Sequence, residues 1–113
     1  MEKTHQMPTS NLADARLVAG ALSGNQGAFE ELIARYQHKA FAIALAAGVR
    51  RDSVPDVLQD AFVRAFRALP QLEAFGSYGS WFLTIVRNVA RRSLREAPRA
   101  AADAAGDGKA AGV

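Results

Sequence analysis

Apolar side chains recur at intervals of three and four residues along most of this chain, which is the spacing of one face of an α-helix. The pattern is found in residues 12–23, 26–48, 53–70 and 77–98. None of these segments shows the strict alternation of apolar and polar residues that is typical of a half-buried strand. The sequence therefore predicts an all-α fold, a compact bundle of about four helices without internal repeats.

Residues at the predicted helix ends agree with this division. Gly24 follows the first helix, Asn25 is expected to cap the second, and Gly48 is expected to end it. We expect Ser53 to cap the third helix, with Asp56 three residues later in an arrangement like a capping box.

The third and fourth helices each carry a predicted inward face. For the third helix the inward positions are Val54, Val57, Leu58, Ala61, Phe62, Ala65, Phe66 and Leu69. For the fourth helix they are Tyr78, Phe82, Ile85, Val86, Val89 and Leu94. Burial of these faces would supply the modest core that a single small domain requires.

The chain has 113 residues, which is enough for one small domain. We expect a flexible N-terminus at residues 1–11 and a helical domain at residues 12–97. Residues 98–113 are mostly Ala, Gly and Asp, and Pro98 should stop the last helix. This final segment is predicted to be a disordered tail or an interdomain linker.

Composition excludes several kinds of site. There is no cysteine and there are two histidines, so we expect neither a disulfide framework nor a zinc cluster, and we predict no metal or cofactor. No nucleophile and base are paired in a recognisable motif and no phosphate loop is present, which argues against an enzyme. The N-terminus lacks an apolar signal segment, and no apolar run is long enough for a membrane span. These features predict a soluble, cytoplasmic protein without membrane insertion.

A polar ridge follows the outward side of the third predicted helix. This acidic ridge consists of Asp56, Gln59, Asp60 and Val63, at three- and four-residue spacing. Carboxylates and an amide so arranged can accept forked hydrogen bonds from arginines on another helix. A solvated helix face is the commoner explanation of such a ridge, and the residues alone leave both explanations open.

The fourth predicted helix becomes strongly basic after residue 86. The net charge is only +3, but the positive charge is concentrated here, at Arg87, Arg91, Arg92, Arg95 and Arg99. Such a stripe could neutralise phosphates along one groove, giving salt-dependent binding with little sequence information of its own. The stripe exceeds what a favourable interaction with the helix dipole needs, so it favours nucleic acid.

An aromatic loop leads into this helix. Its candidate residues are Phe75, Gly76, Ser77, Tyr78, Ser80 and Trp81. Aromatic groups beside small polar residues can stack on an unpaired base and bond its edge, which suits single-stranded nucleic acid. For Phe75 and Trp81 a place in the core under the loop is at least as good an explanation, because large aromatic residues in a small bundle are usually buried.

Three stretches occur in an order that is informative as a set. They are Gly-Asn-Gln-Gly-Ala-Phe-Glu-Glu-Leu-Ile-Ala-Arg-Tyr at residues 24–36, Asp-Val-Leu-Gln-Asp-Ala-Phe-Val-Arg-Ala-Phe at residues 56–66 and Trp-Phe-Leu-Thr-Ile-Val-Arg-Asn at residues 81–88. Together they resemble region 2 of the bacterial extracytoplasmic-function (ECF) sigma factors, which are part of the sigma-70 family. The resemblance extends over about residues 12–96.

The resemblance implies a promoter-recognition module of RNA polymerase. In that family the Asp-x-x-Gln-acidic ridge docks on the coiled coil of the polymerase clamp, a role that would fall here to Asp56, Gln59 and Asp60, with Val63 beside them. The loop and the start of the last helix in that family bind the non-template strand of the minus-ten promoter element, with one base flipped into a pocket. The residues implied are those of the aromatic loop, for the base, and Arg87, Asn88, Arg91, Arg92 and Arg95, for the strand and flanking duplex. An anti-sigma factor is a further expected partner.

Two other functions fit parts of the pattern. A sigma-like decoy that sequesters an anti-sigma protein could keep the acidic ridge, but it has no need for the arginine stripe. An unrelated helical nucleic-acid-binding domain would keep the stripe, but it has no need for Asp56, Gln59 and Asp60 together. The presence of both features favours promoter recognition.

Overall fold

Four α-helices make up most of the described chain, as the apolar pattern predicts. In a computed structural model that describes the backbone of residues 9–105 and the side chains of residues 11–96, they are α1 (Thr9–Leu22), α2 (Gln26–Ala47), α3 (Val54–Ala68) and α4 (Tyr78–Ala105). Short 3-10 helices lie in the connections: η2 (Arg51–Ser53), η3 (Leu69–Gln71) and η4 (Phe75–Ser77). Within residues 9–105 there is no strand, and the all-α prediction is confirmed.

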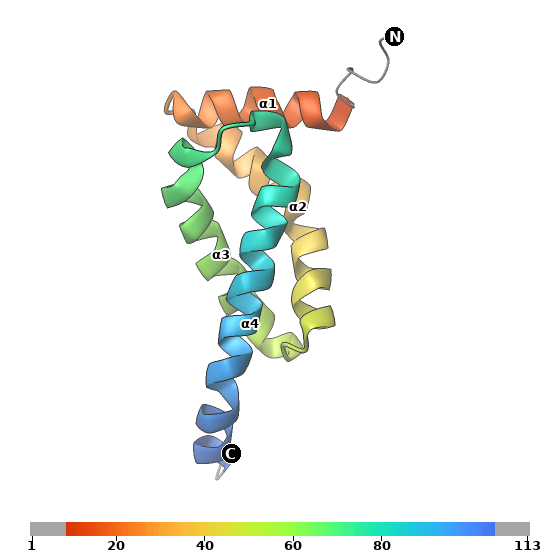
Figure 1. Cartoon of the computed structure of the whole chain (residues 1–113), viewed down its shortest axis with the longest axis vertical. Helices are drawn as coiled ribbons and strands as arrows, with labels where there is room; N and C mark the ends of the chain where they lie inside the picture. Colours follow the sequence, from red (N-terminus) through yellow and green to blue (C-terminus); the bar gives the residue numbers. More distant parts are fainter. Residues whose placement is uncertain (1–8, 106–113) are drawn as a thin grey trace.

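Helices α2, α3 and α4 run along the long axis of the molecule and pack against one another, while α1 lies across one end (Figure 1). Helix α1 contacts α2, η4 and α4. The start of α4 lies beneath α1, and the C-terminal part of α4 extends past α2 and α3 at the opposite end (Figure 1). The two halves of α4 therefore have very different surroundings.

Two of the predicted helix ends are confirmed and one is wrong. The side chain of Asn25 accepts a hydrogen bond from the amide of Ala28 at 3.1 Å, which caps α2. Gly48 ends α2 with a φ of 110°, a left-handed conformation that glycine adopts at little cost. Ser53 makes no side-chain cap, because it belongs to η2 and has helical rather than extended backbone angles. The predicted capping box with Asp56 is therefore absent.

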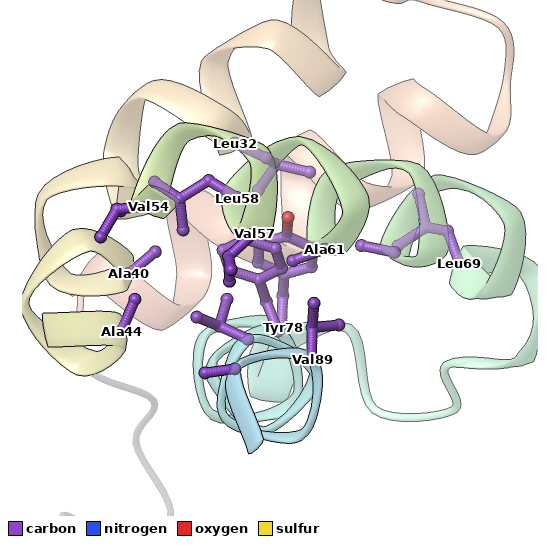
Figure 2. Close-up of a cluster of buried hydrophobic side chains, with 14 of the residues drawn as sticks. Leu32, Ala40, Ala44, Val54, Val57, Leu58, Ala61, Leu69, Tyr78 and Val89 are labelled. Carbon is purple, nitrogen blue, oxygen red and sulfur yellow. The ribbon is translucent and has the colours of Figure 1, made fainter. Parts of the chain in front are cut away.

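The core lies where α2, α3 and α4 meet, with α1 closing one end. Figure 2 shows side chains from α2 and α3 meeting Tyr78 and Val89 of α4. Most of the predicted inward positions are buried. The buried members of the core cluster are Val18, Leu32, Ala40, Ala44, Val49, Val54, Val57, Leu58, Ala61, Ala65, Leu69, Leu72, Tyr78, Phe82, Val86, Val89 and Ala90. Many of these are small residues, which lets the helix backbones approach closely.

Phe66 is a correction to the predicted core. Its side chain was expected to face inward, yet it is 60% exposed. The apolar stripe of α3 is wider than the surface that α2 and α4 cover, so the residue at its edge stays outside. Phe66 instead packs edge-on against Phe29 of α2, with ring centroids 5.1 Å apart.

The ends of the domain also differ from the prediction. Helix α1 begins by Thr9, before the expected start at residue 12. Helix α4 continues through Pro98 to Ala105, so the expected stop at Pro98 is wrong. Ala97 precedes this proline and three alanines follow Arg99, and alanine has the highest helix propensity of all residues, which favours continuation of the helix. Residues 1–8 and 106–113 lie outside the described part of the chain, and the division into flexible N-terminus, domain and linker stays a prediction.

Candidate functional site

The acidic ridge lies on the outer side of α3. Asp56, Gln59 and Val63 are exposed and Asp60 is partly buried, because the opposite side of α3 faces the core. Nε of Arg64 donates a hydrogen bond to Oδ1 of Asp60, at 2.8 Å, one turn along the helix. The two side chains are 44% and 43% exposed, so this ion pair contributes little to stability. Asp60 therefore remains accessible to a partner.

The basic residues cover the outer side of α4. The arginine face consists of Arg87, Asn88, Arg91, Arg92 and Arg95, all of them exposed. Arg87 and Arg91 line a groove of about 280 Å³ against α2, whereas Arg92 and Arg95 line one of about 380 Å³ against α3. The cations thus flank α4 on both sides, whereas the sequence suggested a stripe along one groove. The side chain of Arg99 lies outside the described residues.

The acidic ridge and the arginine face share a border. Asp56 and Asp60 of α3 line a groove of about 180 Å³ together with Arg92, Ser93 and Glu96 of α4. A partner that contacts the ridge would therefore lie next to one edge of the arginine face. The two surfaces that the sequence placed on neighbouring helices are adjacent in space as well.

The loop before α4 and the first turn of α4 are only partly accessible. Ser77 and Ser80 are exposed, Gly76 is half-buried, and Phe75 and Trp81 are half-buried and pack against the core cluster. The hydroxyl of Ser80 donates to the carbonyl oxygen of Ser77 at 3.3 Å across the start of α4. The accessible groups here are thus small hydroxyls beside the exposed parts of two aromatic side chains.

Tyr78 was predicted both to face inward on the fourth helix and to contact a base, and the structure supports the inward position. Its side chain is fully buried, so the tyrosine belongs to the core. Its ring stacks on Phe82, with centroids 5.7 Å apart and an interplanar angle of 4°, and it also lies against Tyr36 and Trp81. Burial raises the pKa of its hydroxyl well above the ordinary value. Among the residues described, this hydroxyl has no hydrogen-bond partner.

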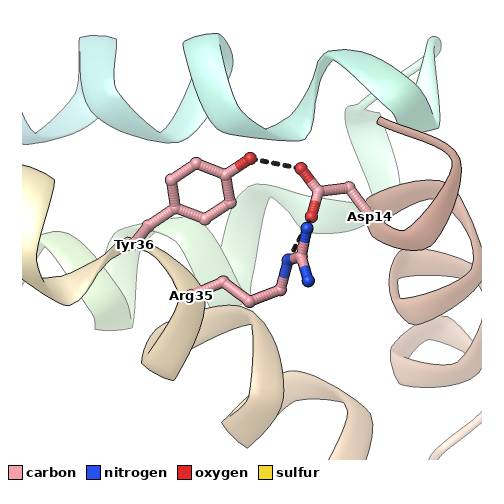
Figure 3. Close-up of polar contacts among 3 residues, drawn as sticks. All are labelled: Asp14, Arg35 and Tyr36. Carbon is pink, nitrogen blue, oxygen red and sulfur yellow. Dashed lines mark hydrogen bonds and ion pairs between the residues drawn. The ribbon is translucent and has the colours of Figure 1, made fainter. Parts of the chain in front are cut away.

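Sequence reasoning missed a buried polar cluster next to this loop. Asp14 of α1 is completely buried and accepts hydrogen bonds from Nε of Arg35, at 2.7 Å, and from the hydroxyl of Tyr36 (Figure 3). Burial, followed by the hydrogen bond to Asp14, raises the pKa of Tyr36 to about 12. The signal was present in the sequence, because Asp14 lies four residues before Val18 on the inward face of α1.

Other kinds of site have little support in the described residues. Among the side chains of residues 11–96, no group of His, Asp or Glu is arranged to hold a metal ion. In the same part of the chain, no helix has the length and apolar character that crossing a membrane requires.

Comparisons with known proteins agree with this geometry. Residues 32–100 match the sigma-70 region 2 family. The chain is similar to the ECF RNA polymerase sigma-E factor of Escherichia coli strain K12, with 36% identity over 86 residues, which are 76% of this chain and 44% of that protein. It is also similar to the ECF RNA polymerase sigma-E factor of Haemophilus influenzae, with 32% identity over 83 residues, which are 74% of this chain and 43% of that protein. The chain thus spans less than half the length of these curated relatives.

A solved structure gives the same result at the level of the fold. The NMR structure of an engineered region 2 of sigmaE in complex with GTAAAA superposes with a TM-score of 0.70 at 32% sequence identity. The similarity covers 88% of this chain and 96% of that one. The resemblance found in the sequence is therefore confirmed. The chain belongs to the sigma-70 region 2 family, and within it the chain is similar to region 2 of the ECF sigma factors.

Proposed function

We propose that this chain docks on the clamp of core RNA polymerase and recognises and melts the minus-ten promoter element. In this proposal the acidic ridge on α3 contacts the coiled coil of the clamp. The loop before α4 and the arginine face of α4 hold the non-template strand. The observation that carries the proposal is that two exposed surfaces of opposite character share a border on adjacent helices of a sigma region 2 fold.

The proposed DNA contacts are supported by the related region 2 of sigmaE, whose structure is a complex with GTAAAA. This chain shares that fold, and it presents exposed Ser77 and Ser80 beside half-buried Phe75 and Trp81. Hydroxyls next to aromatic rings can bond the edge of an unstacked base and support its face. The arginine face then neutralises phosphates on either side of α4.

The proposed docking site is supported by the chemistry of the acidic ridge. The carboxylates of Asp56 and Asp60 and the amide of Gln59 can accept several hydrogen bonds from arginines of the clamp. Val63 adds an exposed apolar contact, with 36% of its surface accessible. Asp60 already pairs with Arg64, so a partner arginine would have only a weak surface ion pair to displace.

Melting in this proposal involves no covalent chemistry. A protein that binds unstacked bases but not paired ones shifts the equilibrium toward the open strand by its difference in affinity for the two states. The loop supplies that difference, whereas the arginine face binds both states through their phosphates. Docking on polymerase raises the effective concentration of the domain near the promoter.

The DNA part of the proposal is tested by fluorescence anisotropy with labelled single strands. GTAAAA is compared with its permutation AAGATA and with a pool of randomised six-nucleotide strands, at two salt concentrations. We expect some strands of the pool to bind at least about tenfold more tightly than the rest, which is the discrimination that one or two well-placed base contacts supply. Equal binding of all strands would contradict base recognition.

The docking part is tested by capture of core RNA polymerase. Asp60→Arg reverses one charge of the acidic ridge, and Asp52→Arg makes the same change at an exposed site in η2. We expect Asp60→Arg to weaken capture by about tenfold or more, because it places a cation against the arginines of the clamp. Asp52→Arg should have little effect. Equal capture by the two variants, with folding checked by circular dichroism, would remove the acidic ridge from the docking site.

The exposed arginine face distinguishes this proposal from a decoy, which would need no phosphate contacts. Binding to an anti-sigma factor stays a prediction that rests on the family alone. A preparation that captures polymerase and shows no DNA affinity at low salt would favour the decoy.

A further inference from the structure

A continuous set of contacts runs from the middle of α1 to the first turn of α4. It begins at the buried carboxylate of Asp14, continues through the hydroxyl of Tyr36 on α2, and ends at Gly79 on α4. Figure 3 shows the tyrosine hydroxyl pointing directly at the carboxylate, with the guanidinium of Arg35 on its other side. None of these groups is exposed on the arginine face or the acidic ridge. Their position suggests a task other than direct contact with a partner.

The carboxylate of Asp14 is held in one orientation by burial and by its hydrogen-bond partners. Asp14 is fully buried, and a buried charge is tolerated only where partners replace the water it has lost. The two carboxylate oxygens of Asp14 bind two different residues of α2. Oδ1 accepts a hydrogen bond from Arg35, and Oδ2 accepts one from Tyr36. This division fixes the orientation of the carboxylate and, with it, the position of the tyrosine hydroxyl.

The tyrosine in turn defines where α4 can begin. A Cβ placed on Gly79 would lie 2.5 Å from the hydroxyl oxygen of Tyr36 and 2.8 Å from the carbon that bears it, closer than side chains can approach. The first turn of α4 therefore rests on the edge of the Tyr36 ring. The same ring lies 5.7 Å from the ring of Tyr78, the residue just before Gly79.

The loop is also held from the other side. Helix α1, which carries Asp14, packs directly on η4, the short helix of residues 75–77. The exposed hydroxyls of Ser77 and Ser80 lie immediately before and after the residues that Tyr36 contacts. A shift of Tyr36 would thus move both hydroxyls relative to the arginine face.

We infer that Asp14 is a positioning residue for base recognition, which holds the loop before α4 in register with the arginine face through Tyr36 and Gly79. The inference rests on the proposed function, because it assigns base recognition to this loop. It adds a specificity-determining element on α1, a helix that carries none of the proposed DNA or polymerase contacts.

The test uses variants of the whole chain that alter the cluster in different ways. Tyr36→Phe removes only the hydroxyl, and Asp14→Asn removes the charge while keeping one oxygen acceptor. Asp52→Asn makes the same chemical change on an exposed aspartate in η2. Val89→Ala weakens the core in a later turn of α4 and leaves the cluster intact, so it is the control for a loss of stability alone.

Two readouts separate positioning from stability. The first is the ratio of the affinities for GTAAAA and AAGATA. If the chain prefers a sequence other than GTAAAA, the ratio of the affinities for the best and the average strand of the random pool is used instead. For Tyr36→Phe and Asp14→Asn we expect this ratio to fall on the order of tenfold, because small displacements of positioned groups are costly. The salt dependence of binding should stay unchanged. Both variants are measured at a temperature where they are folded. Asp52→Asn and Val89→Ala should keep the ratio of the unaltered chain.

The second readout needs no DNA. Trp81 is the only tryptophan of the chain and lies in the first turn of α4, next to the loop, so quenching of its fluorescence by acrylamide reports how open this region is. We expect faster quenching in Tyr36→Phe and in Asp14→Asn, and unchanged quenching in Asp52→Asn. If Asp14→Asn does not fold, Tyr36→Phe decides the question alone.

The outcomes keep the two proposals apart. If the unaltered chain prefers no strand, the proposed function fails, and the quenching of Trp81 alone decides whether the cluster positions the loop. If the unaltered chain has a strand preference that Tyr36→Phe retains in full, with quenching also unchanged, the positioning role of Asp14 is overturned while the proposed function stands. A loss of preference in Val89→Ala equal to that in Tyr36→Phe would also overturn it, because stability would then explain the effect.

Discussion

The two halves of α4 are held in opposite ways. The first half, from Tyr78 to Val86, packs against α1, α2 and α3, and the rings of Tyr78 and Phe82 stack within the core. The half that begins at Arg87 keeps, as far as Glu96, only part of its surface in the core and presents cations on much of the rest. One helix can thus divide two tasks between its ends. A packed, rigid end suits discrimination between bases, whereas an exposed basic end suits affinity for any strand.

The core around the first half of α4 should be the part of the molecule whose stability is most sensitive to substitution. Phe82 is fully buried and stacks on Phe62 and Tyr78, so Phe82→Ala should lower the free energy of unfolding by about 3 to 5 kcal/mol. Phe66→Ala removes the same side chain from an exposed site and should cost about 1 kcal/mol or less. Urea denaturation measures both values. Equal losses would contradict the division between a packed and an open part of the bundle.

Substitutions in the polar cluster beneath α1 should have the next largest effect on the free energy of unfolding. Asp14→Ala leaves Arg35 and Tyr36 without their shared acceptor, and we expect a loss of about 3 kcal/mol in the free energy of unfolding. Asp52→Ala breaks an exposed pair with Arg50 and should leave the free energy of unfolding nearly unchanged. Thermal and urea unfolding of the two variants give the comparison. A cost for Asp14→Ala as small as that for Asp52→Ala would mean that the cluster does not anchor α1.

An alkaline titration tests the same end of the molecule without a substitution. The chain has two tyrosines, Tyr36 and Tyr78, and in the folded state the pKa of each is raised above 10.0, that of Tyr36 to about 12. Since the folded pKa of Tyr36 exceeds the unfolded one, its contribution to stability is fully present below pH 10 and is lost as the pH rises from 10 to 12.

The titration is followed by the ultraviolet absorbance of tyrosinate. Native protein should show little tyrosinate at pH 10, whereas protein unfolded in guanidinium should be half ionised near that pH. Half ionisation of a native tyrosine at pH 10 would place that ring in water and contradict the packing described for the start of α4.

The exposed half of α4 should respond to substitution in binding and not in stability. Arg91→Ala should lower the affinity for all single strands several-fold, and it should reduce the salt slope by about 0.7, the value for one phosphate contact on a single strand. Arg67→Ala, on α3, removes the same charge outside the arginine face and serves as the control. An unaltered slope in Arg91→Ala would remove Arg91 from the phosphate contacts.

Helix periodicity predicted much of this architecture, because most of the apolar side chains that it placed on the inward faces of α3 and α4 are buried. The outward position of the acidic ridge follows from the same spacing. Phe66 was misplaced because periodicity gives the direction of a face but not its width, which depends on the neighbouring helices. Tyr78 was predicted both on the inward face of the fourth helix and among the contacts with a base, because periodicity and the neighbouring aromatic loop point to different roles, and its burial agrees with the inward position.

The buried cluster was out of reach for a different reason. Asp14 lies on the inward face of α1, yet its partners Arg35 and Tyr36 are on another helix, and their pairing depends on how α1 crosses α2. Periodicity along one helix carries no information about a crossing angle. An aspartate at an inward position is the one sign of such a pairing that the sequence offers.

The proposed division of tasks places base discrimination in the loop and the first turn of α4, and strand affinity in the arginine face. It is tested most directly by measuring affinity against salt concentration for the preferred strand and for its permutation, with the unaltered chain. Because both strands would meet the same arginines, we expect two parallel lines of log affinity against log salt, separated by a constant offset that comes from the loop. Lines that coincide would show that the chain does not discriminate between bases. Lines that converge as salt rises would show that the arginine face itself carries the specificity, which would contradict the account.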